Sequence, residues 1–161
     1  MFSSCVEFSN VSKSFQDKTV IKSVSIRLPL DATTALVGES GSGKSTFLRL
    51  INGLVVPDAG EVLLAGKTID YKNLPGLRRA MGFAVQGAGL FPHLTIRENV
   101  TLVAGLEGWS KQKMIERYRE LFDLLALSDE FSDRYPHMLS GGQQQRVSLC
   151  RAMMLDPPLM L

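Results

Sequence analysis

The spacing of apolar and polar positions predicts strands in the first half of the chain. Residues 6–15 and 20–28 predict two strands; the second mixes apolar and polar positions, and Asp17-Lys18 supplies the turn between them. Residues 33–37, a β-prone run that ends at glycine, predict a strand buried on both faces. Three further short strands are expected. Residues 61–64 and 67–69 predict a hairpin after the turn Pro57-Asp58-Ala59-Gly60, and residues 82–85 predict a buried strand.

Helical spacing is found once near the start and dominates after residue 95. Residues 44–51 carry apolar side chains at helical intervals, and residues 74–79 predict a short helix or turn. Thr95 with Glu98 three residues later is typical of a capping box. Ser110 opens a second helix, and Gly141-Gly142 precedes a third. The second helix has an apolar stripe made by Met114, Tyr118, Leu121, Phe122 and Leu125.

Composition places the chain among globular proteins of about one domain. It has 161 residues, of which 45% are hydrophobic and 21% charged, so disorder is excluded as the main content. The net charge of +2 does not indicate a nucleic-acid partner. Cys5 and Cys150 form no zinc or disulfide pattern; we expect both to be packing residues in a reducing compartment. The sequence predicts neither a signal peptide nor a membrane span.

The strongest motif fits the pattern G-x-x-x-x-G-K-[ST] between a predicted strand and a predicted helix. Its residues are Gly38, Glu39, Ser40, Gly41, Ser42, Gly43, Lys44 and Ser45, with Thr46 following. Such a loop points backbone N–H groups at one phosphate anion, and the helix N-terminus adds positive potential. Lys44 would bind the β- and γ-phosphates, and the Ser45 hydroxyl would hold Mg²⁺. The motif therefore predicts a site for ATP and Mg²⁺.

A second anion-facing helix start is expected at residues 139–143. Ser140, Gly141, Gly142 and Gln143 follow Leu139, and a serine with two glycines at a helix N-terminus can face an anion. A simple helix cap explains the serine but leaves the pair of glycines unexplained. One nucleotide needs two such helix starts only if they meet across it.

These two motifs, with Gln86 between them, resemble the nucleotide-binding domain of an ABC transporter over essentially the whole chain. The resemblance implies an α/β P-loop ATPase fold with an antiparallel β subdomain and a helical insert. It implies that Phe15 stacks on adenine, although core packing is the alternative for this side chain. It also implies that Gln86 contacts Mg²⁺ and the attacking water. Residues 140–143 would reach the ATP of a second subunit, which answers the question of two helix starts.

Further pieces resemble importers of glycine betaine and related quaternary amines. They are Gly89-Leu90-Phe91-Pro92-His93, Gly108-Trp109, Arg134-Tyr135-Pro136 and Gln143-Gln144-Gln145-Arg146-Val147, while Gly87-Ala88 departs from the usual pattern. Other importer subfamilies share most of these pieces. The resemblance implies a homodimer, transmembrane permease subunits, an indirect solute-binding protein and a peripheral position on the cytoplasmic face of the membrane.

The predicted domain organisation is a partial nucleotide-binding domain over residues 1–161. It has a β-rich P-loop core over residues 1–86, a helical part over about 87–140, and the signature helix with the start of a further strand over 141–161. The chain ends in an apolar run where the family has its Walker B strand, so we expect the Mg²⁺-binding Asp, the catalytic Glu and the switch His to be absent. We therefore expect the 161-residue chain itself to bind ATP without hydrolysing it, as a binding-only module would. A soluble ABC-type ATPase that is not coupled to transport stays open as an alternative. An importer of another substrate, such as amino acids, also remains.

Overall fold

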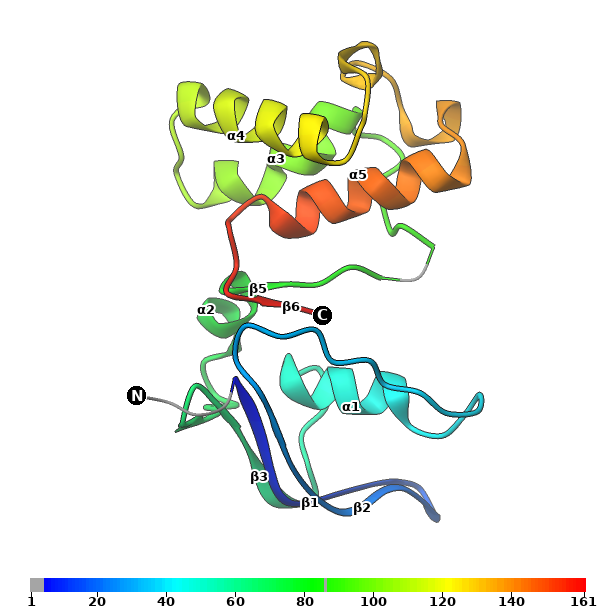
Figure 1. The fold of residues 1–161 in the computed structure, drawn as a ribbon, viewed down its shortest axis with the longest axis vertical. Coiled ribbons are helices and arrows are strands. Elements are labelled where there is room, and N and C mark those ends of the chain that lie inside the picture. Colours follow the sequence, from blue (N-terminus) through cyan, green and yellow to red (C-terminus); the bar gives the residue numbers. More distant parts are fainter. Residues whose placement is uncertain (1–4, 86) are drawn as a thin grey trace. The chain divides into compact units, whose positions relative to one another are not determined.

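The structure is a computed structural model that describes residues 5–85 and 87–161. The chain divides into two compact units, Met1–Arg78 and Arg79–Leu161. Figure 1 shows the elements of each unit in sequence colours.

The first unit is built on an antiparallel sheet with the strand order β2-β1-β3-β4. The strands are β1 (Val6–Phe15), β2 (Lys18–Leu28), β3 (Ala59–Leu64) and β4 (Lys67–Thr68). The predicted strand pair at the start of the chain and the hairpin after residue 60 are both confirmed. β1 lies between β2 and β3, and its pairing with β2 shifts register near Val11, Lys13 and Ser14.

Helix α1 (Lys44–Ile51) has the predicted bounds and packs on this sheet. Its buried residues are Phe47, Leu50 and Ile51. The ring of Phe47 stacks on Phe8 of β1, with 4.1 Å between ring centroids and an interplanar angle of 7°. This aromatic pair is a large apolar contact that fixes the helix against the strand.

The predicted strand over residues 33–37 is wrong. These residues form no regular element, and the side chain of Val37 is 93% exposed. A strand buried on both faces needs paired neighbours and covering layers. In the described part of the first unit, the sheet is formed by β2, β1, β3 and β4, and residues 33–37 pair with none of these strands. Helix α2 (Leu74–Arg79) lies where it was predicted.

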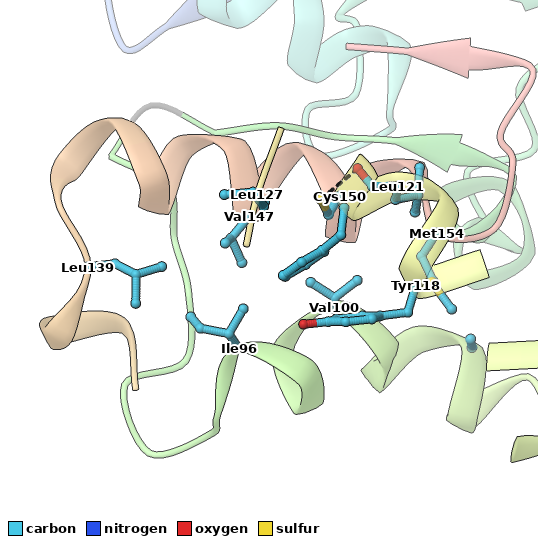
Figure 2. Close-up of a cluster of buried hydrophobic side chains, with 11 residues drawn as sticks. Ile96, Val100, Tyr118, Leu121, Leu127, Leu139, Val147, Cys150 and Met154 are labelled. Carbon is cyan, nitrogen blue, oxygen red and sulfur yellow. Dashed lines mark hydrogen bonds between the residues drawn. The ribbon is translucent and has the colours of Figure 1, made fainter. Parts of the chain in front are cut away.

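The second unit contains three longer helices around one apolar core. They are α3 (Ile96–Leu106), α4 (Lys111–Leu124) and α5 (Gly141–Met153), with 3₁₀ turns at Asp129–Phe131 and Pro136–Met138. Figure 2 shows side chains of all three helices meeting. The buried cluster consists of Ile96, Val100, Ala104, Tyr118, Leu121, Phe122, Leu127, Leu139, Val147, Cys150 and Met154.

A short parallel pair, β5 (Met81–Gly82) with β6 (Leu159–Met160), belongs to the same unit. The buried strand predicted over residues 82–85 is therefore confirmed only at Gly82, because residues 83–85 form no regular element and Val85 is exposed. Two further backbone bonds continue the pairing: the Leu161 N–H donates to the Gly82 carbonyl at 2.8 Å, and the Ala84 N–H donates to the Leu161 carbonyl at 2.9 Å. Among the described residues, no helix combines the length and apolar character that crossing a bilayer requires.

Candidate nucleotide-binding site

The loop before α1 has the backbone of an anion-binding helix start. The residue before the helix, Gly43, has φ +96°, and Gly41 has φ +82°, a region that side chains rarely adopt. No side chain caps the helix, and its first turn has no acidic residue. The N–H groups at the start of a helix have no partner within the helix. They therefore present uncompensated positive potential at this end of α1.

The position of Gly43 also depends on how closely β2 approaches the loop. A Cβ at Gly43 would lie 3.1 Å from the Val20 carbonyl oxygen and from side-chain carbons of Val20 and Ile21. Only glycine combines this φ with such close contact. Strand β2 therefore packs against the loop at Gly43. The loop residues Gly38–Ser42 are exposed.

Lys44 bends back over the loop that precedes it. Its Nζ donates to the carbonyl oxygens of Gly38 and Glu39, each at 2.7 Å, and lies 3.4 Å from the Ser42 hydroxyl. The ammonium group is therefore held at the centre of the loop. The neighbouring Ser45 is exposed and Thr46 is partly buried. The predicted phosphate-binding residues are thus gathered at one helix end, in an arrangement that fits a phosphate chain.

Phe15 is a surface aromatic at the end of the β1–β2 hairpin. Its side chain is 46% exposed, so the alternative of core packing does not hold. In the hairpin it pairs with Lys18, two residues before the Val20 that supports Gly43. The same hairpin therefore carries the exposed ring and the support of the loop.

The second predicted helix start, at residues 140–143, belongs to the second unit. The Ser140 hydroxyl accepts from the Gln143 N–H at 3.3 Å, and the Gln143 side-chain oxygen accepts from the Ser140 N–H at 2.8 Å. This is a capping box. A methyl group at Gly141 or Gly142 would meet no atom within 4 Å, and neither glycine has a positive φ. Neither packing nor backbone conformation within the described residues therefore requires glycine at these two positions.

Two buried or anchored polar residues were missed by sequence reasoning. Asn99 is fully buried, and its side chain bonds the loop between Phe91 and Thr95. Its spacing from Ile96 on the apolar face of α3 is the signal that could have found it. Asp58 bonds Lys13 and Ser14 across 45 and 44 positions of sequence, and only its place in a predicted turn singled it out.

Gln86, the predicted contact of Mg²⁺ and the attacking water, lies outside the described residues.

Comparison with known proteins gives the family of this chain. A sequence model described as "ABC transporter" matches residues 21–161. The chain belongs to the ABC transporter family. This confirms the resemblance drawn from the motifs around Lys44 and Ser140.

Curated relatives in this family include ATP-binding proteins of several uptake systems. The glycine betaine uptake system ATP-binding protein YehX of Escherichia coli is 44% identical over 97% of this chain and 51% of its own length. The choline transport ATP-binding protein OpuBA of Bacillus subtilis is 42% identical over 94% of this chain and 40% of its own length. The Fe(3+) ions import ATP-binding protein FbpC of Yersinia pestis is also 42% identical, over 98% of this chain and 45% of its own length. The chain thus spans about half or less of these relatives.

Solved ABC structures have the same fold. The dimeric structure of MJ0796, a bacterial ABC transporter cassette, matches with a TM-score of 0.88 and 32% identity over 96% of this chain and 72% of its own. A post-hydrolysis dimer of the same cassette, bound to ADP and Pi, matches with a TM-score of 0.86 and 33% identity over the same shares. The predicted α/β ABC ATPase fold class is therefore confirmed.

Proposed function

We propose that this chain is part of the ATP-binding subunit of an ABC importer, in which MgATP binding and hydrolysis drive uptake of a small solute. The observation that carries the proposal is the uncapped start of α1, where Lys44 is held at the centre of an exposed glycine loop. The ABC family match over residues 21–161 supports it.

The residues of the first unit would bind the nucleotide as follows. The N–H groups at the start of α1 take the phosphate oxygens, and the Lys44 ammonium exchanges the carbonyls of Gly38 and Glu39 for the β- and γ-phosphates. Ser45 is exposed, and its hydroxyl is the ligand offered to Mg²⁺, which would neutralise the phosphates when bound. Phe15 provides an exposed face for adenine. Gln86 remains a proposed contact of the metal and the attacking water.

The second unit would act on the nucleotide of a second subunit. Gly141 and Gly142 are open on the side where a methyl group would stand, so another surface can approach the backbone closely. Ser140 and Gln143 stand beside them at the positive end of α5. We infer that Ser140, Gly141, Gly142 and Gln143 contact the γ-phosphate held by the partner in a head-to-tail homodimer. A dimeric ABC cassette among the matching structures supports this arrangement.

The 161-residue chain by itself is proposed to bind MgATP without appreciable turnover. No group of three or more His, Cys, Asp or Glu residues suited to hold a metal is present among the described residues. A glutamine at position 86 cannot accept a proton from water at neutral pH. Loss of a positioned base lowers a rate by roughly 10² to 10⁴. Phosphate release by the purified chain should therefore equal that of its Lys44→Ala variant.

The transported solute is proposed to be glycine betaine or a related quaternary amine. YehX and OpuBA are named for glycine betaine and choline. An importer of another substrate is the second candidate, because FbpC is named for Fe(3+) at similar identity. The complete subunit would then work with transmembrane permease subunits at the cytoplasmic face of the membrane, and with a solute-binding protein indirectly. Uptake of labelled glycine betaine, choline and iron by cells that lack this gene would decide between the candidates.

The nucleotide site is tested by equilibrium titration with a fluorescent ATP analogue. Lys44→Ala should weaken MgATP binding at least about tenfold, or about 1.4 kcal/mol, because the charge at the phosphates is removed. Lys72→Ala, which removes an exposed lysine outside the loop, is the control and should bind like the original protein. Equal affinity of the folded Lys44→Ala variant would contradict the proposed site.

A further inference from the structure

The carboxylate of Asp58, in the turn after α1, forms hydrogen bonds with residues at the end of β1. Its Oδ1 accepts from Lys13 Nζ at 2.6 Å, and its Oδ2 accepts from the Ser14 backbone N–H at 2.7 Å. The Asp58 N–H in turn donates to the Ser12 carbonyl at 2.9 Å. One residue therefore bonds three consecutive residues of β1, and two of the bonds involve its charge. The Lys13 ammonium and the Ser14 N–H hold the pKa of this carboxyl below its usual value.

The Asp58 bonds to Lys13 and Ser14 lie just beyond the end of the pairing between β1 and β3. The pairing of β1 with β3 ends at Ser12 and Ala59. On the other side, the pairing with β2 is irregular between Val11 and Ser14. On the β3 side, the bond from the Ser14 backbone N–H to the Asp58 carboxylate therefore takes the place of a sheet bond, while on the other side Ser14 pairs with Thr19 of β2.

The Lys13 side chain lies between Asp58 and the ring of Phe15. Its Nζ is 5.5 Å from the ring centroid and 2.6 Å from the Asp58 Oδ1, and its side chain is only 16% exposed. A cation against an aromatic ring is attracted to the ring face. Lys13 thus supports Phe15 from one side, while the ring as a whole stays 46% exposed.

We propose that Asp58 is a positioning residue for the nucleotide base, acting through Ser14 and Lys13 to hold the ring of Phe15. Asp58 follows α1 in the chain, so it links the end of the phosphate-binding helix to the aromatic ring that meets the base. The inference rests on the proposed nucleotide site. It assigns to Asp58 an effect on the base part of the ligand and none on the phosphate part.

The test compares MgATP with magnesium tripolyphosphate, which has the phosphates but no base, as competitors of a fluorescent nucleotide. Asp58→Asn keeps the shape of the side chain and removes the charge that holds Lys13. It should weaken MgATP about threefold or more and leave tripolyphosphate unchanged. Phe15→Ala should weaken MgATP about fivefold or more, again without effect on tripolyphosphate. In the double variant, Asp58→Asn should cause no further loss, because its effect passes through Phe15.

Glu7→Gln is the matched control, since Glu7 also forms an ion pair on β1, with Arg27 at 3.0 Å, but at the other end of the strand. It should leave both affinities unchanged. Equal weakening of ATP and tripolyphosphate by Asp58→Asn would mean a general structural role and overturn the inference. Additive effects of Asp58→Asn and Phe15→Ala would also overturn it, as would unchanged ATP affinity in Asp58→Asn.

A second measurement tests directly how firmly the aromatic ring at position 15 is held. The chain has one tryptophan, so Phe15→Trp combined with Trp109→Phe gives a single tryptophan fluorophore at the end of β1. Adding Asp58→Asn should increase acrylamide quenching of this fluorophore without nucleotide, and Glu7→Gln should not. Unchanged quenching would overturn the inference even if ATP binds. Absence of ATP binding to the original protein, or unchanged binding in Lys44→Ala, would instead remove the proposed function and the inference with it.

Discussion

Ser140 and Gln143 form reciprocal hydrogen bonds at the start of α5. The serine hydroxyl accepts from the glutamine backbone N–H, and the glutamine side-chain oxygen accepts from the serine backbone N–H. Thr95 and Glu98 form the same reciprocal pair at the start of α3. The two pairs have the same local role in their helices. In the proposed dimer, only the pair on α5 also faces a nucleotide.

Replacing either capping residue should cost similar stability, with different effects on assembly. Ser140→Ala and Thr95→Ala should each lower the free energy of unfolding by about 1 kcal/mol, because each removes an N-cap acceptor. Denaturant titration measures this. Ser140→Ala and the bulkier Ser140→Arg should also reduce ATP-dependent dimerisation in size-exclusion chromatography, whereas Thr95→Ala should dimerise normally. Normal dimerisation of Ser140→Arg would leave the segment as a helix cap only.

The glycines of α5 should show opposite effects on stability and on assembly. Gly141→Ala and Gly142→Ala meet open space in helical backbone, so each should keep or raise stability, by up to about 1 kcal/mol. Both should weaken ATP-dependent dimerisation, because the added methyl group separates the backbone from the partner's phosphate. Thermal unfolding and size-exclusion chromatography with ATP are the measurements.

Gly105→Ala is the control for these variants, since Gly105 of α3 is also helical and open. It should gain stability and dimerise like the original protein. If all three glycine variants dimerise equally, the open side of α5 does not meet a partner.

Asn99 should be among the most sensitive polar positions of the second unit. Its side chain accepts from the Phe91 N–H at 2.7 Å and donates to the carbonyls of Phe91, Leu94 and Thr95, each at 3.0 Å. Asn99→Ala would take this partner from the Phe91 N–H and the Leu94 carbonyl, whereas the carbonyls of Phe91 and Thr95 keep backbone partners, and it should lower the free energy of unfolding by about 3 kcal/mol. Urea unfolding measures the loss.

Gln112 offers the comparison, because it is exposed on α4 and bonds Glu116 within the same helix. Gln112→Ala should change stability by less than about 0.5 kcal/mol. A loss for Asn99→Ala no larger than this would show that the loop from Phe91 to Thr95 is held by other contacts.

The two cysteines should differ in reactivity and in their effect on stability at high pH. Burial raises the pKa of Cys150 to about 12 and also raises the pKa of the more exposed Cys5. Iodoacetamide at pH 8 should therefore label Cys5 well before Cys150, as measured by mass spectrometry. A thiol whose pKa is higher in the folded state stabilises that state at low pH, and this contribution is lost as pH rises from about 8.5 toward 12.

Cys150→Ala should accordingly flatten the fall in stability over this alkaline range, even though the variant starts less stable because a buried side chain is shortened. Cys5→Ala should leave most of the fall in place. Faster labelling of Cys150 than of Cys5 in the folded protein would contradict the buried position of its sulfur.

Local patterns predicted what local interactions decide. The bounds of α1 followed from the glycine loop and the spacing of Phe47 and Leu50, and the cap at Thr95 followed from Glu98. The strand expected over residues 33–37 failed because β propensity states a preference, while a strand forms only where a neighbour pairs its backbone. The bond of Asp58 to Ser14 spans 44 positions, and no local pattern of charge or spacing predicts such a contact.

The parallel pair of β5 and β6 bears on how the second unit folds. Met81 pairs with Leu159, so this pairing closes a loop that contains α3, α4 and α5. Closing a long flexible loop costs entropy before a two-residue strand can repay it. If the helices pack first, the loop shortens to their compact core, and the pairing becomes a local event. Folding kinetics should then place formation of the helical cluster in the transition state, with β5 and β6 joining late on the native side of the barrier.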